Sequence, residues 1–375
     1  MTGALRIATL FQIPVRIHWS FLLIFVYVFY TGNQQEWDLT NILWSLGFVL
    51  VLFTCVVMHE FGHALTARRY GVQTRDIILS PIGGVARLDH LPERPGQEFL
   101  VAIAGPLVNV AIAVVISPYL LTLGASSRTQ LFQILLNPNG NYFPSGLSQL
   151  DYFLAGLIML NLMLALFNLI PAFPMDGGRV LRALLSVRLR RDQATRIAAY
   201  TGQTLAVAFM IYGVWYAGNF FYLLIGGFVF FAAAGEYRMV RTEQYLRSHT
   251  VSDIVRFPFR RLYVTDTMEN AIRLLGSDGQ HSYLVLNQWQ DVVGILSPRQ
   301  IKAAHEARQY DQPVTAFMSV VPIHLMNTDT LEEAYRALQS STVHTLPVYD
   351  RSGRLCGMVD LPGLERFVQL SRSRK

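Results

Sequence analysis

The chain has 375 residues, of which 52% are hydrophobic and only 15% are charged, and its formal net charge is +6. A soluble domain carries roughly 25% charged residues, so this composition excludes an ordinary soluble protein for much of the chain. The positive charge is modest and forms no nucleic-acid-binding motif, so we expect no nucleic-acid partner. The two cysteines lie far apart, at Cys55 and Cys356, and predict no disulfide framework.

Apolar runs alternate with short charged loops up to about residue 240, and the rest of the chain is polar and mixed. A membrane-spanning helix needs about 20 mostly apolar residues. We therefore expect an α-helical polytopic membrane domain over 1–240 and a soluble domain over 241–375. The six expected spans are 18–33, 42–66, 98–123, 151–173, 202–217 and 219–235.

Arginine is distributed unevenly over the loops between these spans. Loops 67–97 and 176–201 carry five and six arginines, whereas loops 34–41 and 124–150 carry only Arg128 between them. Because arginine-rich loops stay on the cytoplasmic side, this pattern places both termini and the soluble domain in the cytoplasm. We expect a multi-pass protein of the cell membrane that contacts the lipid bilayer.

The second expected span contains "MHEFGH", residues 58–63, near its end. An ionisable side chain at membrane depth costs roughly 2.5–3.5 kcal/mol on insertion, so it indicates a function. On a helix, His59 and His63 share one face and can bind the same metal ion, with Glu60 beside them as a base. The alternative is that these are interfacial residues at a helix end.

The segment "DIILSPIGGVARLDHL" (76–91) has apolar and β-branched residues around Gly83 and Gly84. It predicts a β-hairpin that dips toward the membrane, because a Gly-Gly pair permits a tight turn. An irregular loop is the alternative.

A catalytic zinc ion normally has three protein ligands, so the histidine pair needs a third. Asp176 is the candidate, in "NLIPAFPMDGG" (168–178). The prolines break the preceding helix, and Gly177 and Gly178 let the backbone turn. Its carboxylate would then face a cavity in the protein. The alternative is that Asp176 only caps the following helix.

Together, "HEFGH" and the later "NLIPAFPMDG" resemble the paired motifs of the site-2 protease family of intramembrane zinc metalloproteases. "GPLVN" (105–109) and "RIHWS" (16–20) resemble further elements of that family, and the resemblance covers about 1–240. It implies one Zn²⁺ per chain, held by His59, His63 and Asp176, with Glu60 activating water for peptide hydrolysis.

The resemblance further implies a membrane-anchored protein substrate, such as an anchored transcription regulator or a signal-peptide remnant, cut in or near its transmembrane segment. Because the loop charges place the end of the second span and the start of the 176 loop in the cytoplasm, we expect cleavage on the cytoplasmic side. Asn109 and Asn168 would bind the substrate backbone or the developing oxyanion, unless they only join helices by hydrogen bonds. Gly83 and Gly84 would offer a strand edge to an unwound substrate.

The soluble part contains an internal repeat: "TDTMENAIRLL" (265–275) matches "TDTLEEAYRAL" (328–338) at an offset of 63. It predicts two α/β copies, at about 250–305 and 313–369, each running strand, acidic helix, strand, turn, strand and helix. The repeat resembles a tandem cystathionine-β-synthase (CBS) domain pair, a regulatory module that often binds adenine nucleotides.

Neither CBS copy keeps the ribose-binding Asp of the nucleotide-binding members. The relevant positions are Ser297 and Gln300 in the first copy and Asp360 and Gly363 in the second. Because the carboxylate of Asp360 would repel phosphate, pairing into a homodimer or contact with substrate is favoured over nucleotide binding.

Two other functions compete with an active protease. An inactive membrane scaffold should have lost at least one of the four residues that carry the chemistry, and all four are present. A CBS-regulated transporter should show paired charges along a pathway, which this sequence lacks.

Overall fold

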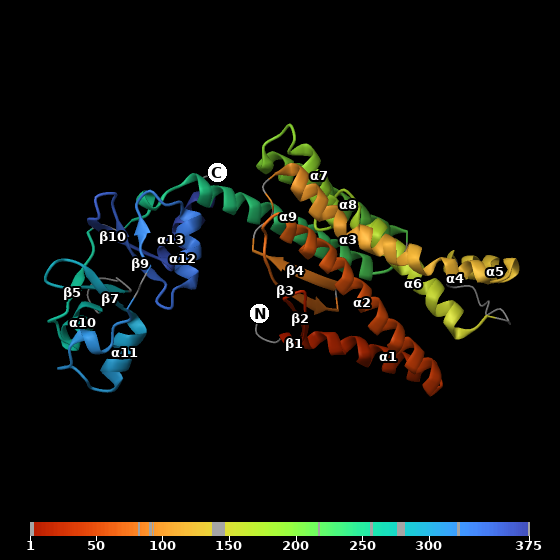
Figure 1. Cartoon of the computed structure of the whole chain (residues 1–375), viewed down its shortest axis with the longest axis horizontal. Helices are drawn as coiled ribbons and strands as arrows, with labels where there is room; N and C mark the ends of the chain where they lie inside the picture. Colours follow the sequence, from red (N-terminus) through yellow and green to blue (C-terminus); the bar gives the residue numbers. More distant parts are fainter. Residues whose placement is uncertain are drawn as a thin grey trace. The chain divides into compact units, whose positions relative to one another are not determined.

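The computed structural model describes residues 4–373 apart from 82, 90, 91, 93, 137–146, 217, 256–257, 276–281 and 321–322. The chain divides into two compact units, Met1–Tyr237 and Arg238–Lys375. The first unit holds long helices with a four-stranded sheet beside them, and the second holds two small sheets with short helices (Figure 1).

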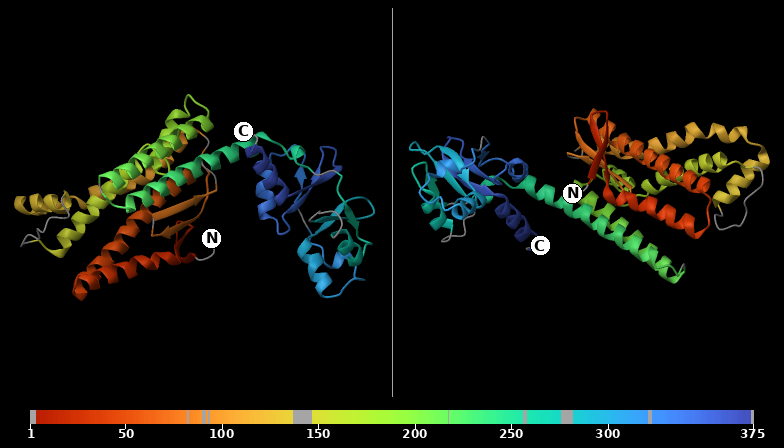
Figure 2. Two further views of the ribbon diagram at one scale, coloured as in Figure 1. Left: turned by 180° about the vertical axis from the view of Figure 1, so that it is seen from behind. Right: turned by 90° about the horizontal axis from the view of Figure 1, so that it is seen from below.

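Unit 1 contains long, mostly apolar helices that pack as a bundle (Figure 2). The described helices are α1 (Leu22–Gln34), α2 (Leu39–Arg69), α3 (Pro95–Ile116), α4 (Pro118–Thr122), α5 (Ala125–Leu136), α6 (Gln149–Asn168), α7 (Asp176–Leu185), α8 (Arg191–Trp215) and α9 (Phe221–Ser248). The 3₁₀ helix η1 (Trp19–Phe21) precedes α1, and α9 continues into unit 2.

Among the described residues, five helices are long and apolar enough to cross a membrane: α2, α3 with α4, α6, α8 and α9. The membrane-helical class expected from the sequence is confirmed, but the first expected span, 18–33, differs. Helix α1 has only 13 residues, about 20 Å at 1.5 Å per residue, against about 30 Å of hydrocarbon. The span is short because the chain up to His18 is a β-strand.

The sheet of unit 1 consists of β1 (Ala4–Leu10), β2 (Ile13–His18), β3 (Thr74–Ser80) and β4 (Gly83–Leu88), in that order. Strands β3 and β4 form the predicted antiparallel hairpin, so the irregular-loop alternative is wrong. The sequence analysis missed β1 and β2. Strand β2 runs parallel to β3, with Val15 opposite Ile77, so the N-terminal segment extends the hairpin into one sheet.

One face of this sheet packs on helix α2. Ile77 and Val15 of the sheet are buried in one apolar cluster with Phe61 and Ala64 of the helix. His59 and His63 lie on a different side of α2, because successive residues of a helix are rotated by about 100°. The helix therefore presents its apolar residues to the sheet while its histidines face other helices.

A buried carboxylate joins three strands of the sheet. Asp76 on β3 is only 2% exposed. Its carboxylate accepts two hydrogen bonds from Arg87 on β4 and forms an ion pair with Arg16 on β2. The bidentate bond from Arg87 holds the pKa of Asp76 below its ordinary value, so the carboxylate stays ionised at neutral pH. This contact keeps β4 in place beside α2.

Unit 2 consists of two copies of one fold. The first copy contains η2 (Val251–Asp253), β5 (Arg261–Tyr263), α10 (Met268–Leu275), β6 (Tyr283–Leu286), β7 (Val292–Leu296) and α11 (Pro298–Glu306). The second contains η3 (Val314–Ala316), β8 (Leu325–Met326), α12 (Leu331–Ser340), β9 (Thr345–Tyr349), β10 (Leu355–Asp360) and α13 (Leu361–Ser373). The predicted element order is confirmed in both copies.

The two copies exchange their leading segments. The N–H of Val251 donates to Asp329 O in the second copy, and the N–H of Val314 donates to Asp266 O in the first. These bonds are equivalent at the offset of 63, so the copies are related by an internal two-fold arrangement.

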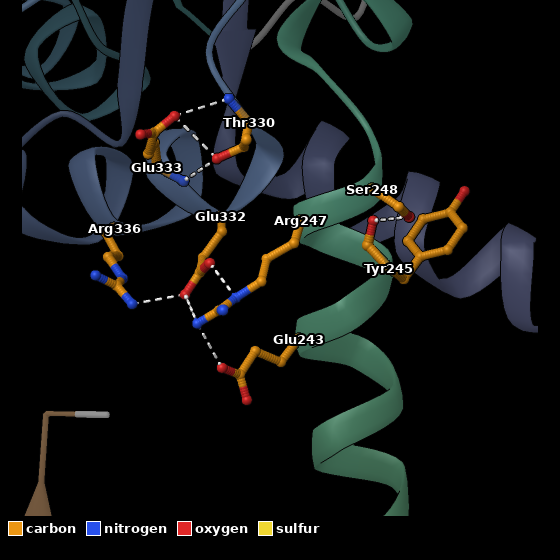
Figure 3. A network of polar contacts seen from close by, with 8 residues as sticks. All are labelled: Glu243, Tyr245, Arg247, Ser248, Thr330, Glu332, Glu333 and Arg336. Atoms are coloured by element: carbon orange, nitrogen blue, oxygen red, sulfur yellow. Dashed lines mark hydrogen bonds and ion pairs between the residues drawn. The ribbon is translucent and has the colours of Figure 1, made fainter. Parts of the chain in front are cut away.

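The last part of α9 is held on the second copy by an ion-pair network. Arg247 pairs with Glu243 on its own helix and with Glu332 on α12, and Glu332 also pairs with Arg336 (Figure 3). Glu332 is 17% exposed at its side chain, so it is partly shielded from water.

We predict that Asp76→Ala destabilises unit 1 by about 1–3 kcal/mol, because two arginines lose a charge-assisted partner. The loss should appear as a lower midpoint for thermal unfolding of the detergent-purified protein. The matched control is Asp89→Ala, which removes an exposed pair with Arg75 and should have almost no effect. Equal midpoints for the two variants would contradict the role of Asp76.

Candidate functional site

Helix α2 brings two histidines to one buried point in the bundle. His59 and His63 are 6% and 4% exposed, and their Nε2 atoms lie 3.1 Å apart. The spacing of four residues places both rings on one face of the helix, as the sequence predicted. The structure therefore brings the motif histidines together away from solvent.

Asp176 reaches the same point from the other end of the sequence. Its Oδ2 lies 3.1 Å from His59 Nε2 and 3.0 Å from His63 Nε2. Helix α6 ends at Asn168 and α7 begins at Asp176, so the predicted helix break is confirmed. Asp176 lies in the first turn of α7, but its carboxylate is directed to the histidines, which argues against capping as its only role.

The glycines after Asp176 act differently from the expectation. We expected Gly177 and Gly178 to turn the backbone, but both lie inside helix α7. A Cβ atom on Gly177 would lie 2.1 Å from Ile170 O, and one on Gly178 would lie 2.5 Å from Phe173 N. Their role is close packing, because only hydrogen leaves room for the loop that precedes them.

A backbone carbonyl sets the protonation of His63. Its Nδ1 lies 2.7 Å from Val101 O on α3. A carbonyl only accepts, so Nδ1 carries the hydrogen and the lone pair of Nε2 faces His59 and Asp176. The Nδ1 atom of His59 has no hydrogen-bond partner among the described residues.

The three converging atoms fit a metal ion. All ligand atoms of this group lie within 4.8 Å of one another, and the closest pairs are at 3.0–3.1 Å. Zinc with ligands at about 2.0–2.1 Å in tetrahedral geometry separates them by about 3.3 Å. Two imidazole nitrogens and one carboxylate oxygen are a common zinc donor set, so the side chains suit this ion.

Helix α3 approaches the histidines at Gly105, which the sequence analysis noted only as part of a motif. A Cβ atom there would lie 2.3 Å from His63 Nε2 and 2.7 Å from His59 Nε2. Gly62 of α2 similarly touches Ala104 O. Glycine is therefore required where α3 crosses the two histidine nitrogens, and the signal for it in the sequence was a glycine inside an apolar helix.

Glu60 points to the sheet. Its Oε2 accepts a hydrogen bond of 2.9 Å from the N–H of Ala86 on β4. Glu60 directly follows His59 on α2 and is three residues before His63. A carboxylate that adjoins the histidines and accepts a hydrogen bond from a strand is thus present at the site.

The four residues that the sequence predicts to contact substrate differ in their burial and in their distance from the histidines. Asn109 is 1% exposed on α3, one turn beyond Gly105, and its Oδ1 has no hydrogen-bond partner among the described residues. Asn168 is the partly exposed last residue of α6. Gly83 and Gly84 begin β4, and Gly84 lies against Glu60.

Arg182, on the same helix as Asp176, is a fully buried cation that was not expected from the sequence. Arg182 of α7 is 0% exposed. Its Nε donates to Glu98 Oε1 on α3 at 2.6 Å, and its Nη1 lies 3.5 Å from Glu236 Oε1 on α9. Its guanidinium carbon also lies 5.1 Å from the centre of the Phe173 ring. A glutamate at the edge of an apolar span was the available signal. These contacts hold α7 and the Asp176 loop against two other helices.

We predict that Gly105→Ala removes most of the bound zinc, because its methyl group would occupy the space next to both histidine nitrogens. Zinc per chain, measured by mass spectrometry on folded, monodisperse protein, checks this. Gly47→Ala is the control, since its Cβ atom meets only open space, and it should keep its zinc. Near-stoichiometric zinc in Gly105→Ala would show that the approach of α3 does not limit binding.

Parts of the chain match two known protein families. The profile of "Peptidase family M50" matches residues 47–211, and that of the CBS domain matches 314–364. A zinc metalloprotease of Methanocaldococcus jannaschii is 38% identical over 255 residues, which cover 68% of this chain and 67% of the relative. A candidate zinc metalloprotease of Synechocystis sp. is 28% identical over 99% of this chain and 97% of its own length.

Among solved structures, a site-2 protease from Methanocaldococcus jannaschii is 34% identical, with a TM-score of 0.44, and the match covers 62% of this chain and 95% of that one. The sequence matches assign the membrane unit to a family and residues 314–364 of the second unit to the CBS domain. The chain therefore belongs to peptidase family M50, the site-2 proteases, and is a zinc metallopeptidase with a C-terminal CBS domain.

Proposed function

We propose that this intramembrane protease cuts a membrane-anchored protein in or near its transmembrane segment, on the cytoplasmic side. The observation that carries the proposal is the convergence of His59, His63 and Asp176 in a bundle of apolar helices. Three such groups are costly to bury without a partner. A peptidase whose site lies among membrane helices must take substrates that are themselves in the membrane.

In this proposal His59, His63 and Asp176 hold one zinc ion. Zinc at such a site supplies Lewis acidity, which polarises a carbonyl group and acidifies a water molecule. Glu60 takes the proton from the attacking water and passes it to the leaving amine. Val101 keeps Nε2 of His63 free through the hydrogen bond at Nδ1.

The edge of the sheet is the proposed place for the substrate backbone. Strand β4 is the terminal strand of the sheet, and a helical substrate must unwind before its carbonyls become accessible. An extended segment adds to such an edge by main-chain hydrogen bonds. Gly83 has a φ of +137°, a conformation that favours glycine, which makes the tight start of β4. Asn109 and Asn168 are proposed to contact the substrate backbone or the oxyanion.

The cytoplasmic placement rests on contacts within unit 1. Strand β2 pairs with the arginine-rich hairpin, so the N-terminal strands and residues 67–97 lie on one side. Glu236, near the end of unit 1, pairs with Arg182 in the other arginine-rich segment. Applying the positive-inside rule to these segments gives both termini, the CBS unit and the cleavage a cytoplasmic location.

For the CBS pair we propose homodimer formation or contact with substrate rather than binding of an adenine nucleotide. Asp360 Oδ1 accepts the N–H of Gly363 at 2.7 Å, and Ser297 forms a capping box with Gln300. These positions serve helix capping, and Gln300 also donates to Ser319. The negative charge of the Asp360 carboxylate would repel a phosphate group and so weaken nucleotide binding.

The first test is zinc per chain in detergent-purified protein. We expect about one zinc ion in the wild type and in Asp89→Ala, and a large loss in Asp176→Ala, because a carboxylate ligand is removed. If the wild type contains no zinc, or if Asp176→Ala leaves the zinc content unchanged, the result would favour an inactive membrane scaffold over a protease.

The second test is cleavage of a single-span reporter protein carrying an epitope tag at its cytosolic end. Glu60→Gln should keep its zinc and lose cleavage by at least a hundredfold, because general-base catalysis contributes about 10²–10⁴. Tag release that continues in Glu60→Gln would argue against Glu60 as the base, and a tag released on the opposite side would argue against cytoplasmic cleavage.

A further inference from the structure

The catalytic helix and the terminal strand touch through one polar contact. The side chain of Glu60 projects from α2, and its Oε2 accepts a hydrogen bond of 2.9 Å from the N–H of Ala86, 26 residues away. A hydrogen bond to an ionised acceptor is shorter and roughly twice as strong as a neutral one. The strand therefore restricts where the Glu60 carboxylate can lie.

Gly84, two residues earlier on β4, lies under the same side chain. A Cβ atom on Gly84 would be 2.8 Å from Glu60 Cγ, 3.2 Å from Glu60 Oε1 and 3.1 Å from Val56 Cγ1. Real Cβ atoms do not approach carbon at 2.8 Å, so any larger residue would push the carboxylate away. Gly84 has no positive φ, so it is space, and not backbone conformation, that requires glycine here.

The strand geometry shows which edge of β4 is involved. Successive residues of a strand direct their N–H and C=O groups to opposite edges. Since the N–H of Ala86 donates to Glu60, Ala86 faces the edge away from β3, and so does Gly84. Ala86 is followed by Arg87, whose bidentate bond to Asp76 holds the strand in the sheet.

We propose that β4 positions the Glu60 carboxylate for catalysis: the N–H of Ala86 holds it, and the missing side chain of Gly84 makes room for it. Ala86 and Gly84 are positioning residues, because they act through Glu60. The inference rests on the proposed role of Glu60 as the base. It assigns to this strand a task separate from substrate pairing.

The same contact limits how a substrate pairs with the strand. An N–H group donates well to one acceptor, and that of Ala86 is already used by Glu60. At this edge an extended substrate is therefore left with the N–H and C=O of Gly84 and the C=O of Ala86, and its regular pairing is interrupted at the N–H of Ala86. The interruption lies beside the base, which is where a scissile peptide must lie for proton transfer.

The experiment compares Gly84→Ala with Gly47→Ala in the purified full-length protein, using the single-span reporter and measuring kcat, KM and zinc content. We expect kcat to fall at least tenfold in Gly84→Ala, with KM within about twofold and zinc unchanged, because only the base is displaced. Gly47→Ala should match the wild type, since its Cβ atom meets open space.

A second variant replaces Ala86 by its α-hydroxy analogue, which turns the amide into an ester and removes only the N–H. It should also lower kcat about tenfold or more with zinc retained. The inference is overturned if either variant keeps full kcat. It is also overturned if Gly84→Ala raises only KM, because the strand would then serve to bind substrate and not to position Glu60. Activity surviving in Glu60→Gln would instead overturn the underlying role of Glu60.

Discussion

The structure of unit 1 depends on the contact of one carboxylate with two imidazoles inside an apolar bundle. Asp176 meets His59 and His63 only because three backbones approach closely. Gly105 lets α3 pass the two histidine nitrogens, and Gly177 lets the loop before α7 fold back on that helix. A single methyl group at either glycine would force these side chains apart. Small residues at helix contacts are a common way to pack membrane helices, and here they also bring the two imidazoles and the carboxylate together.

Buried charge recurs next to this contact, and each time it is paired. Arg182 is enclosed by Glu98 and Glu236, and Asp76 by Arg16 and Arg87. Removing one partner of such a pair leaves an uncompensated charge, which typically costs about 3–5 kcal/mol when it is fully buried. The first pair holds the segment that carries Asp176, and the second holds the strand that touches Glu60. Both pairs thus keep the two halves of the site in register.

Local signals in the sequence predicted the histidine pair, the helix break before Asp176 and the β3–β4 hairpin, because each depends on residues close together in the chain. The contacts missed were non-local. The pairing of β2 with β3 was hidden because "RIHWS" adjoins an apolar run and was read as the start of a span. The contact of Glu60 with Ala86 joins a side chain to a backbone N–H, and backbone groups leave no trace in the residue pattern. The spacing role of Gly105 required knowing which helix crosses the histidines.

In the second unit, too, the contacts that the sequence did not predict are non-local. The repeat predicted two copies, but not that Val251 and Val314 each bond to the other copy. Since each copy supplies a backbone acceptor to the other, we expect the two copies to stabilise each other on folding. A family profile matches only 314–364, yet every described element of the second copy has a counterpart in the first. Because each copy supplies a hydrogen-bond acceptor to the leading segment of the other, we expect a destabilising change in either copy to affect both.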